Sequence, residues 1–347
     1  MKANLISKGE ARSPTHVTFV LATLNEAHRI DRCLRSIRDQ DYDQRAVDIL
    51  VADGGSSDDT LARCEKYGAR VLPNPLVRCE PGIAMLIERV SDGLIVVFAA
   101  DNALLGRDWL ARVTSAFDAP DVVASFCRVA SDGSQGSLSS RYLNRFTDPY
   151  NHFVYWGGAD YPSLPSTYGS QLERREGDTY FFRFGIDDCP LIALAQGVAF
   201  RAPHARDPQT DEDDIVPFAE VARTGLTAYV SDVRLSHAQV RDLWELLRKY
   251  GPRIREKLFP DSPHMLRVKR LNRVRRLRRL VWPLYAFALP LTVSIGVVMA
   301  LKEREALWLY HPVISFAMAC CLVRELLRVA PSLVRAWWSR SLVKVSP

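Results

Sequence analysis

The chain has 347 residues, of which 48% are hydrophobic and 25% are charged, and this fits a large globular domain with an appendage. The net charge is +6, and its excess is concentrated in residues 267–280, RVKRLNRVRRLRRL, which hold eight basic residues and no acid. Because this block adjoins an apolar stretch, it favours anionic lipid as a partner and argues against nucleic acid.

The seven cysteines are scattered along the chain and form no CxxC pair. Their spacing shows no pattern that suggests a disulfide framework, and it favours free thiols in a reducing compartment. Residues 1–15 lack the apolar core of a secretory signal, so we expect them to form a tail and the main domain to stay in the cytosol.

Apolar runs alternate with helical patterns from residue 16 to residue 127. Continuous runs rich in β-branched residues predict buried strands at 16–23, 47–52, 69–72, 94–99 and 122–127. Between them, apolar residues at intervals of three and four predict helices at 30–37, 61–67, 82–90 and 107–117. This alternation predicts an α/β fold with a parallel sheet and right-handed crossovers.

The middle of the chain, from residue 129 to residue 190, is less regular and rich in Ser, Gly, Tyr and Asp. We expect loops and short strands that shape a site there. Beyond it, the pattern predicts strands at 196–200 and 227–230 and helices at 218–222 and 240–258.

Two apolar segments lie near the C-terminus. Residues 280–301 carry no charge, and as a helix they would span roughly 33 Å, against a hydrocarbon core of about 30 Å. In residues 306–323, His311 is the one side chain whose polarity would oppose insertion into a membrane. Residues 302–305, between the two segments, suffice for a tight turn. Basic residues flank the pair on both outer sides, which predicts a transmembrane hairpin with both ends in the cytoplasm. The alternative is a pair of buried core helices in a soluble domain.

These patterns divide the chain into five parts. After the tail, residues 16–260 form the main domain and residues 261–279 form a basic amphipathic segment in the headgroup plane. Residues 280–325 form the transmembrane hairpin, and residues 326–347 form a basic cytoplasmic tail. We therefore expect a protein of the inner, cytoplasmic membrane.

Four motifs lie in order at the ends of predicted strands: TLNEAHRIDRCLRSI, VADGGSSDDT, FAADN, and a DEDD…G…H block downstream. Together they resemble family-two glycosyltransferases of the GT-A fold, over about residues 16–258. Asp101–Trp109 and the pairs Arg141-Tyr142 and Asp148-Pro149 also resemble a bacterial and archaeal subgroup. The resemblance implies a Rossmann-like, mainly parallel sheet flanked by helices. It also implies transfer of a sugar from a nucleotide-sugar donor, with inversion at the anomeric carbon.

The same resemblance implies a nucleotide-sugar site. Thr23, Asn25 and Glu26 would line the nucleotide pocket, and Asp53 would hydrogen-bond the base, because a buried carboxylate selects bases that offer an N–H donor. Gly54 stands where the family often has a second acid. The alternative for Asp53 is a turn residue ahead of two glycines.

A metal site is implied at Asp101, which would bind Mg²⁺ or Mn²⁺ bridging the two donor phosphates. His237 aligns with a family histidine that completes the metal or phosphate site, although alone it would be an ordinary surface histidine. Ala99 replaces the first acid of the family's Asp-x-Asp. This loss suggests weaker or differently shared contacts to metal and nucleotide, supported by Asn102 or His237.

The catalytic base is expected within the acidic run 211–214. Asp214 is the first candidate and Asp213 the second, because clustered carboxylates raise one another's pKa and this suits proton abstraction. The alternative is an acidic helix N-terminus favoured by the helix dipole. Four basic residues further on would bind the diphosphate or a lipid phosphate, or would contact the membrane as a basic face: Arg248, Lys249, Arg253 and Arg255.

The sequence thus predicts a membrane-attached, metal-dependent hexosyltransferase. Its acceptor would be a lipid-linked saccharide in surface-polysaccharide or glycolipid assembly, since anchoring raises the local concentration of such a substrate. One alternative is a polyprenyl-phosphate glycosyltransferase, whose ionised acceptor needs little from a base. Another is an inactive transferase fold that serves as a membrane scaffold.

Overall fold

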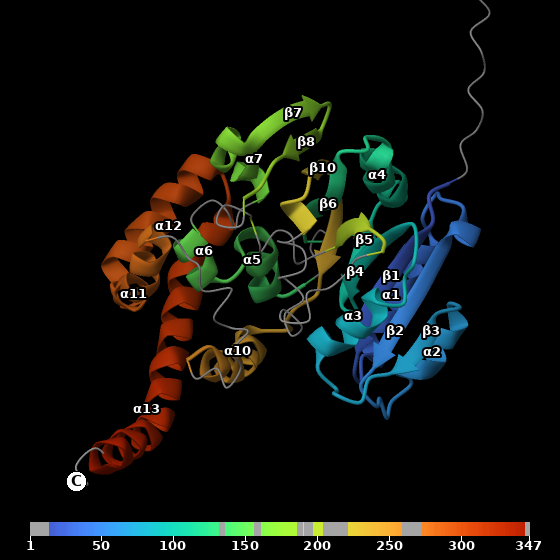
Figure 1. Cartoon of the computed structure of the whole chain (residues 1–347). Coiled ribbons are helices and arrows are strands. Elements are labelled where there is room, and N and C mark those ends of the chain that lie inside the picture. The colour runs from blue at the N-terminus through green and yellow to red at the C-terminus, as the bar shows by residue number, and fades with distance from the viewer. Residues whose placement is uncertain are drawn as a thin grey trace, which may run out of the picture.

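The computed structural model of the chain describes residues 14–131, 136–155, 161–185, 190, 197–203, 221–258 and 273–343. Within this part, one ten-stranded sheet forms the centre of the main domain, and the C-terminal helices lie together on one side of it (Figure 1). The strand order is β3-β2-β1-β4-β9-β6-β10-β8-β7, with β5 paired to β10. The strands are β1 Val17–Thr23, β2 Val47–Asp53, β3 Arg70–Pro73, β4 Leu94–Ala99, β5 Asn102–Leu105, β6 Val122–Val129, β7 Leu172–Glu176, β8 Thr179–Phe182, β9 Val198–Arg201 and β10 Leu226–His237.

Helices cover the sheet and extend the chain beyond it. Those of the main domain are α1 Ala27–Arg38, α2 Thr60–Lys66, α3 Cys79–Ile87, α4 Trp109–Ser115, α5 Leu138–Phe146, α6 Pro149–Tyr155, α7 Leu164–Thr167 and α10 Leu243–Leu258. Three longer helices follow: α11 Arg273–Phe287, α12 Leu289–Glu303 and α13 His311–Val343. A short 3₁₀ helix, η7 Ala306–Tyr310, joins the last two.

The first half of the sheet is parallel and buried on both faces. β1 pairs in parallel with β2 and with β4, so that Thr23 lies opposite Asp53 and Ala22 opposite Ala99. The continuous apolar runs of these strands are almost fully buried, as their composition predicts. The carboxyl ends of three strands therefore meet at one edge, where polar residues follow each of them.

The predicted α/β fold is confirmed, but the sheet is mixed rather than mainly parallel. Parallel pairing holds for β3-β2-β1-β4 and for β6-β10, whereas β9 runs antiparallel between β4 and β6, and β5 and β8 run antiparallel to β10. β5 was not predicted, because it has only four residues and follows β4 after a two-residue turn. In the irregular middle region, α5 and α6 were missed because serines and polar residues on their buried faces hide the usual apolar stripe.

A second hydrophobic core joins the main domain to the C-terminal helices. It is built from α5, α10, α11, η7 and α13, and its larger side chains are Tyr142, Phe146, Trp282, Trp308 and Met318. His311 at the start of α13 is buried within it, where its Nδ1 lies 2.5 Å from the Tyr142 hydroxyl and its Nε2 lies 2.8 Å from the Tyr285 hydroxyl. The C-terminal helices are thus packed onto the main domain.

The first predicted span, residues 280–301, is not one straight helix. The chain bends by 97° between α11 and α12, because Pro290 in the first turn of α12 suits a helix start and not a helix interior. By length and composition, one described helix, Ala306–Arg328, is a candidate span, and the bent pair Arg276–Phe287 and Leu289–Glu303 is a second. Half of the apolar window of the first candidate is buried inside the protein, and core helices of soluble proteins meet the same criteria.

The flanking parts of the predicted hairpin are helical where they are described. Residues 273–279 of the expected amphipathic segment form the first turns of α11, and the rest of that segment lies outside the described residues. The expected tail from residue 326 continues α13 as far as Val343.

One ion pair ties the end of α12 to α5. The Arg145 guanidinium lies 3.1 Å from the Glu303 carboxylate, and both side chains are largely shielded from solvent. In a double-mutant cycle of Arg145→Ala and Glu303→Ala, we expect a coupling energy of about 1 kcal/mol in the free energy of unfolding. The control is the exposed pair Arg107 and Asp41, separated by 2.7 Å, whose coupling should be about 0.5 kcal/mol or less. Equal coupling in the two cycles would contradict the packing described here.

Candidate active site

The loop after β2 is organised by the carboxylate of Asp53. One carboxylate oxygen accepts hydrogen bonds from the backbone N–H groups of Gly55 and Ser56 at 2.9 and 2.8 Å, and the other accepts from the Ser56 hydroxyl at 2.5 Å. Gly55 has φ +94°, a conformation that favours glycine. Asp53 therefore has the turn role that the sequence left open as an alternative.

The loops after β1 and β2 are joined through Asn25. The side-chain oxygen of Asn25 accepts from the backbone N–H of Ser57 at 2.8 Å, and the backbone N–H of Asn25 donates to the Ser56 hydroxyl at 2.9 Å. Asn25 adopts φ +54°, which asparagine tolerates better than most residues. Thr23 is buried beside this junction, and its hydroxyl has no hydrogen-bond partner among the described residues. The structure thus brings Thr23, Asn25 and Asp53 together at one edge of the sheet.

Asp101 meets His237 directly beyond the end of β4. Asp101 Oδ1 lies 3.1 Å from His237 Nε2, and the two side chains are only 17% and 13% exposed. This contact follows from the pairing of β5 with β10, which sets Asn102 opposite His237. Burial raises the pKa of Asp101, but the imidazole of His237 and the nearby basic groups outweigh it and hold that pKa below its usual value. The carboxylate is therefore ionised.

The carbonyl of His237 is held by α5. Ser140 Oγ donates to it at 3.2 Å and Asn144 Nδ2 donates to it at 3.0 Å. The His237 ring has one further polar atom, Nδ1, which is buried and has no hydrogen-bond partner among the described residues. α5 consequently fixes the backbone from which the imidazole reaches Asp101.

Arg29 lies among three carboxylates that come from different elements. Its guanidinium nitrogens lie 3.6 Å from Glu26, 3.9 Å from Asp101 and 3.7 Å from Glu245. Burial raises the pKa of Glu26, and the neighbouring Asp101 contributes to the same shift. Lys249 adds a second positive charge, since its ammonium lies 3.1 Å from Glu245 and donates to the Gln239 carbonyl at 2.8 Å.

Sequence reasoning missed Arg29 and Glu245 as members of this cluster. Arg29 follows Glu26 by three residues and Glu245 precedes Lys249 by four, spacings that place side chains on the same face of a helix. Such pairs are usually solvated surface pairs, so the spacing alone gave no reason to place them at the site. Only the packing of α10 near α1 reveals the cluster.

The donor atoms of Asp101 and His237 fit a divalent cation. Two ligands at neighbouring positions of an octahedron, each about 2.1 Å from the metal, are about 3 Å apart, close to the observed 3.1 Å. A carboxylate oxygen and an imidazole nitrogen are both ligands of divalent first-row metals. Among the described residues no group of three or more His, Cys, Asp or Glu could hold a metal ion. Substrate phosphates and water would therefore have to complete the coordination.

Ala99, which stands where the family pattern has the first acid of Asp-x-Asp, lies at the end of β4. Ala99 lies opposite Ala22 of β1, and its carbonyl is 3.5 Å from the Cys33 thiol. Glu26 supplies another carboxylate close enough to interact electrostatically with Asp101. The site thus keeps a second acid near Asp101, contributed by the start of α1 and not by β4.

The remaining predicted residues lie further out or are not described. Arg248 is exposed on α10. Asp213 and Asp214 lie outside the described residues, as do the side chains of Arg253 and Arg255. The expected base therefore stays a prediction.

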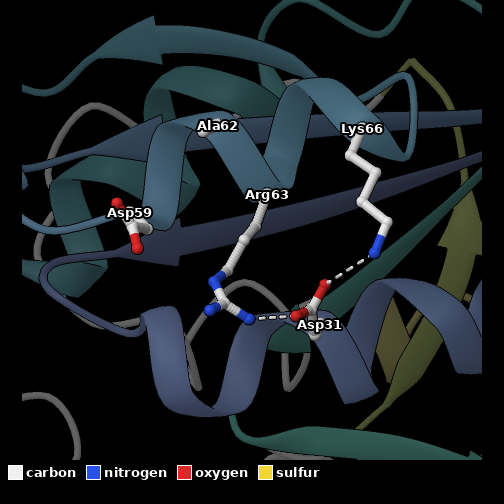
Figure 2. Close-up of a pocket in the computed structure, with 5 residues that line it drawn as sticks. All are labelled: Asp31, Asp59, Ala62, Arg63 and Lys66. Atoms are coloured by element: carbon white, nitrogen blue, oxygen red, sulfur yellow. Dashed lines mark hydrogen bonds and ion pairs between the residues drawn. The ribbon is translucent and has the colours of Figure 1, made fainter.

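A shallow hollow elsewhere on the surface is occupied by ion pairs. Figure 2 shows Asp31 of α1 facing Arg63 and Lys66 of α2. The Lys66 ammonium lies 3.8 Å from the Asp31 carboxylate. Its lining contains none of the predicted site residues, so we place the candidate site at the strand ends instead.

Comparison with known proteins finds a protein family whose model matches part of the chain. Residues 18–175 match a protein-family model described as "Glycosyl transferase family 2". This range includes Thr23, Asn25, Glu26, Asp53 and Asp101. It ends before His237 and α10. No curated protein matches the chain.

Several solved structures are similar over most of the chain. Mannosyltransferase PcManGT from Pyrobaculum calidifontis, in complex with GDP-Man and Mn²⁺, is 16% identical over 90% of this chain and 88% of its own, with a TM-score of 0.47. TarS 1–349 from S. aureus, in complex with UDP-GlcNAc, is 12% identical over 91% and 92%, with a TM-score of 0.45. Glucosyl-3-phosphoglycerate synthase from Mycobacterium tuberculosis, in complex with Mn²⁺, UDP and glucosyl-3-phosphoglycerate, is 17% identical over 72% and 82%, with a TM-score of 0.40.

The carboxylate of Glu245 makes the free energy of unfolding depend on pH. Burial raises its pKa, but the Arg241 amide and the Lys249 ammonium outweigh burial and lower the pKa from 4.5 to about 2. A lowered folded-state pKa stabilises the fold above the unfolded-state value and loses this effect as the pH falls. Glu245→Gln should therefore lower the free energy of unfolding above about pH 4.5, and the deficit should vanish toward pH 2. Urea unfolding at several pH values measures it, with the exposed Glu65→Gln as the control. A deficit that stays constant down to pH 2 would exclude this ionic role.

Proposed function

Residues 18–175 make this chain a member of glycosyltransferase family 2, with the GT-A fold, and on that premise we propose a metal-dependent nucleotide-sugar transferase centred on Asp101 and His237. One observation carries the proposal: an ionised carboxylate and an imidazole lie 3.1 Å apart at the edge where β1, β2 and β4 end. Ligands bind at this edge in open α/β sheets.

The donor nucleotide would lie over the joined loops after β1 and β2. Thr23 offers a buried hydroxyl without a partner among the described residues, and Asn25 holds the two loops together. Asp53 keeps its place in this proposal, because Oδ1 accepts only from Ser56 among the described residues and a carboxylate oxygen has a second lone pair. A base N–H can use that lone pair while the turn stays intact.

Asp101 and His237 would hold Mg²⁺ or Mn²⁺, with Asn102 beside them. When bound, the ion neutralises charge that develops on the leaving diphosphate. The chain's own cations would add to this effect: Arg29 lies beside Asp101, and Lys249 of α10 is fixed by contacts with the Gln239 carbonyl and the Glu245 carboxylate. Arg248, one residue before Lys249, is exposed and would contact the outer phosphate or the acceptor.

The acceptor we propose is a lipid-linked saccharide, with inversion at the anomeric carbon and Asp214 as the base that takes the proton from the acceptor hydroxyl. The C-terminal helices support attachment to a membrane, because they expose many large apolar side chains next to a basic block. The main domain would lie in the cytosol. Attachment beside the bilayer raises the local concentration of a lipid-linked acceptor.

Replacement of Asp101 tests the metal site. We expect Asp101→Ala to reduce Mn²⁺-stimulated turnover of the nucleotide sugar at least about 100-fold, because the strongest metal ligand is lost. The exposed Asp41→Ala is the control and should keep full activity. Circular dichroism would verify that both variants fold. Equal turnover in Asp101→Ala and the parent would reject the metal assignment, and a parent without turnover on any donor would favour the inactive scaffold.

Replacement of Asp214 distinguishes the acceptors. A saccharide hydroxyl needs a general base, which contributes about 10²–10⁴-fold, whereas a polyprenyl phosphate is already ionised. Asp214→Asn should therefore abolish transfer to a saccharide acceptor and largely spare transfer to a phosphate acceptor. Asp213→Asn is the matched variant, because it tests whether the neighbouring carboxylate is the base instead of Asp214. If the parent transfers only to polyprenyl phosphate, the saccharide acceptor is wrong.

A further inference from the structure

The connection between α12 and α13 lies against the main domain. On α5, Arg145 lies 3.1 Å from Glu303 and 3.8 Å from Glu305, and Ser139 Oγ lies 2.9 Å from the Tyr310 hydroxyl. The Trp308 indole N–H donates to the same Glu303 carboxylate at 2.9 Å. The segment 303–310 is therefore fixed to α5 by ion pairs and hydrogen bonds at both of its ends.

The same helix α5 contacts the candidate active site. Ser140 and Asn144 donate to the His237 carbonyl, while Ser139 and Arg145 contact the segment 303–310. One helix thus separates the site from this segment, and the diameter of a helix is about 10 Å. The hydrocarbon core of a bilayer is about 30 Å thick. A hairpin that placed residues 302–305 on the far side of the bilayer would have to break all of these contacts.

α13 also stays beside the main domain along the next part of its length. The Cys321 thiol lies 3.6 Å from the Leu247 carbonyl of α10, and Gly251 of α10 lies next to Arg324 and Glu325. α10 is the helix that brings Glu245 to Arg29 at the candidate site. The candidate span Ala306–Arg328 therefore runs along the main domain, and Figure 1 shows α10 next to α13.

α12 contacts the protein along one narrow face. Thr292 and Gly296 are its buried residues, and a Cβ atom at Gly296 would come within 2.8 Å of the Trp308 carbonyl. Most of its other large side chains are exposed and apolar: Leu289, Leu291, Val293, Val297, Val298 and Leu301. The thirteen residues 289–301 extend about 20 Å as a helix, less than the thickness of the hydrocarbon core.

α11 has the pattern of a helix that lies in a membrane surface. Leu277, Leu280 and Leu284 follow at intervals of three and four, and Leu280 and Leu284 are 75% and 73% exposed. The helix begins with RVRRLRR, so arginines flank this apolar stripe. Arginine side chains at such a position reach lipid phosphates while the leucines enter the acyl region.

We propose that α11 and α12 form a one-sided anchor that enters a single leaflet of an anionic bilayer from the side of the main domain and returns to that domain without crossing. This inference rests on the membrane attachment proposed above and replaces the spanning hairpin predicted from hydropathy. The 97° bend lets α11 lie in the headgroup plane while α12 leads the chain back to α5. The active site is thereby held at a fixed height above the leaflet that carries the acceptor.

The test compares the side of the membrane on which two new cysteines lie. Lys302→Cys marks the end of α12, and Asp178→Cys marks an exposed turn of the main domain. Inverted membrane vesicles from an expression host are treated with a membrane-impermeant maleimide, with and without detergent. Peptide mass spectrometry separates these sites from the exposed native thiols Cys79 and Cys320. Sugar transfer is measured on the same vesicles.

A one-sided anchor predicts that both cysteines react alike, so that detergent changes their labelling ratio by less than about twofold. A rise of tenfold or more for Lys302→Cys upon detergent addition would place the two residues on opposite sides. That result would overturn the one-sided anchor and leave the proposed transferase intact. A chain that stays in the supernatant would overturn the membrane attachment itself, whereas absent sugar transfer with same-side labelling would overturn only the enzymatic proposal.

A second measurement identifies the lipid surface. In sedimentation with vesicles of phosphatidylglycerol and phosphatidylcholine, Leu284→Glu should weaken binding at least tenfold, because it puts a charge on the stripe of α11. Leu61→Glu, at an exposed leucine of α2, is the matched control and should bind as the parent does. Binding that is unchanged in Leu284→Glu, or that is equal on pure phosphatidylcholine, would overturn the assignment of an anionic leaflet to this face.

Discussion

The contact between Asp101 and His237 is the constraint on which the candidate site depends. Two largely shielded side chains from distant parts of the chain are held 3.1 Å apart, and the course of one strand alone does not bring them together. Asp101 follows β4, whereas His237 ends β10, and the two meet because β5 turns back to pair with β10. This contact is therefore a product of the sheet topology. A cation bound here would find its protein ligands already positioned, which reduces the entropic cost of forming the site.

α5 gives this contact its mechanical support and connects it to the C-terminal helices. Serine and asparagine side chains hold the His237 carbonyl, while an arginine and another serine hold the segment before α13. The buried polar residues of α5 thus have partners on two sides, as buried polar groups require. Movement of the C-terminal helices at a membrane would be transmitted to the backbone of His237 through a single short helix. The proposed membrane attachment would therefore act on the geometry of the site through α5.

The sequence predicted what local patterns determine and missed what tertiary contacts determine. Continuous apolar runs located β1, β2 and β4, and the polar residues after them lie at the edge of the sheet where we place the candidate site. β5 and α5 were missed, because four residues and a serine-rich stretch carry little periodicity of their own. Arg29 and Glu245 look like ordinary helical surface residues until α10 packs near α1. The hydropathy pattern predicted one span over residues 280–301, because hydropathy contains no information on the helix start at Pro290 or on the ion pair between Arg145 and Glu303.

The loss of an acid at Ala99 is best understood as part of a charge balance. Glu26, Asp101 and Glu245 surround Arg29, and Lys249 lies beyond Glu245, so the cluster already pairs three carboxylates with two cations. A further acid on β4 would add negative charge where the proposed donor diphosphate would also have to be accommodated. With alanine there, the second carboxylate near Asp101 is Glu26, whose pKa is raised by its burial. Asp101, whose pKa is held below its usual value, is the carboxylate that would serve as the fixed anion for a divalent cation in the proposed function.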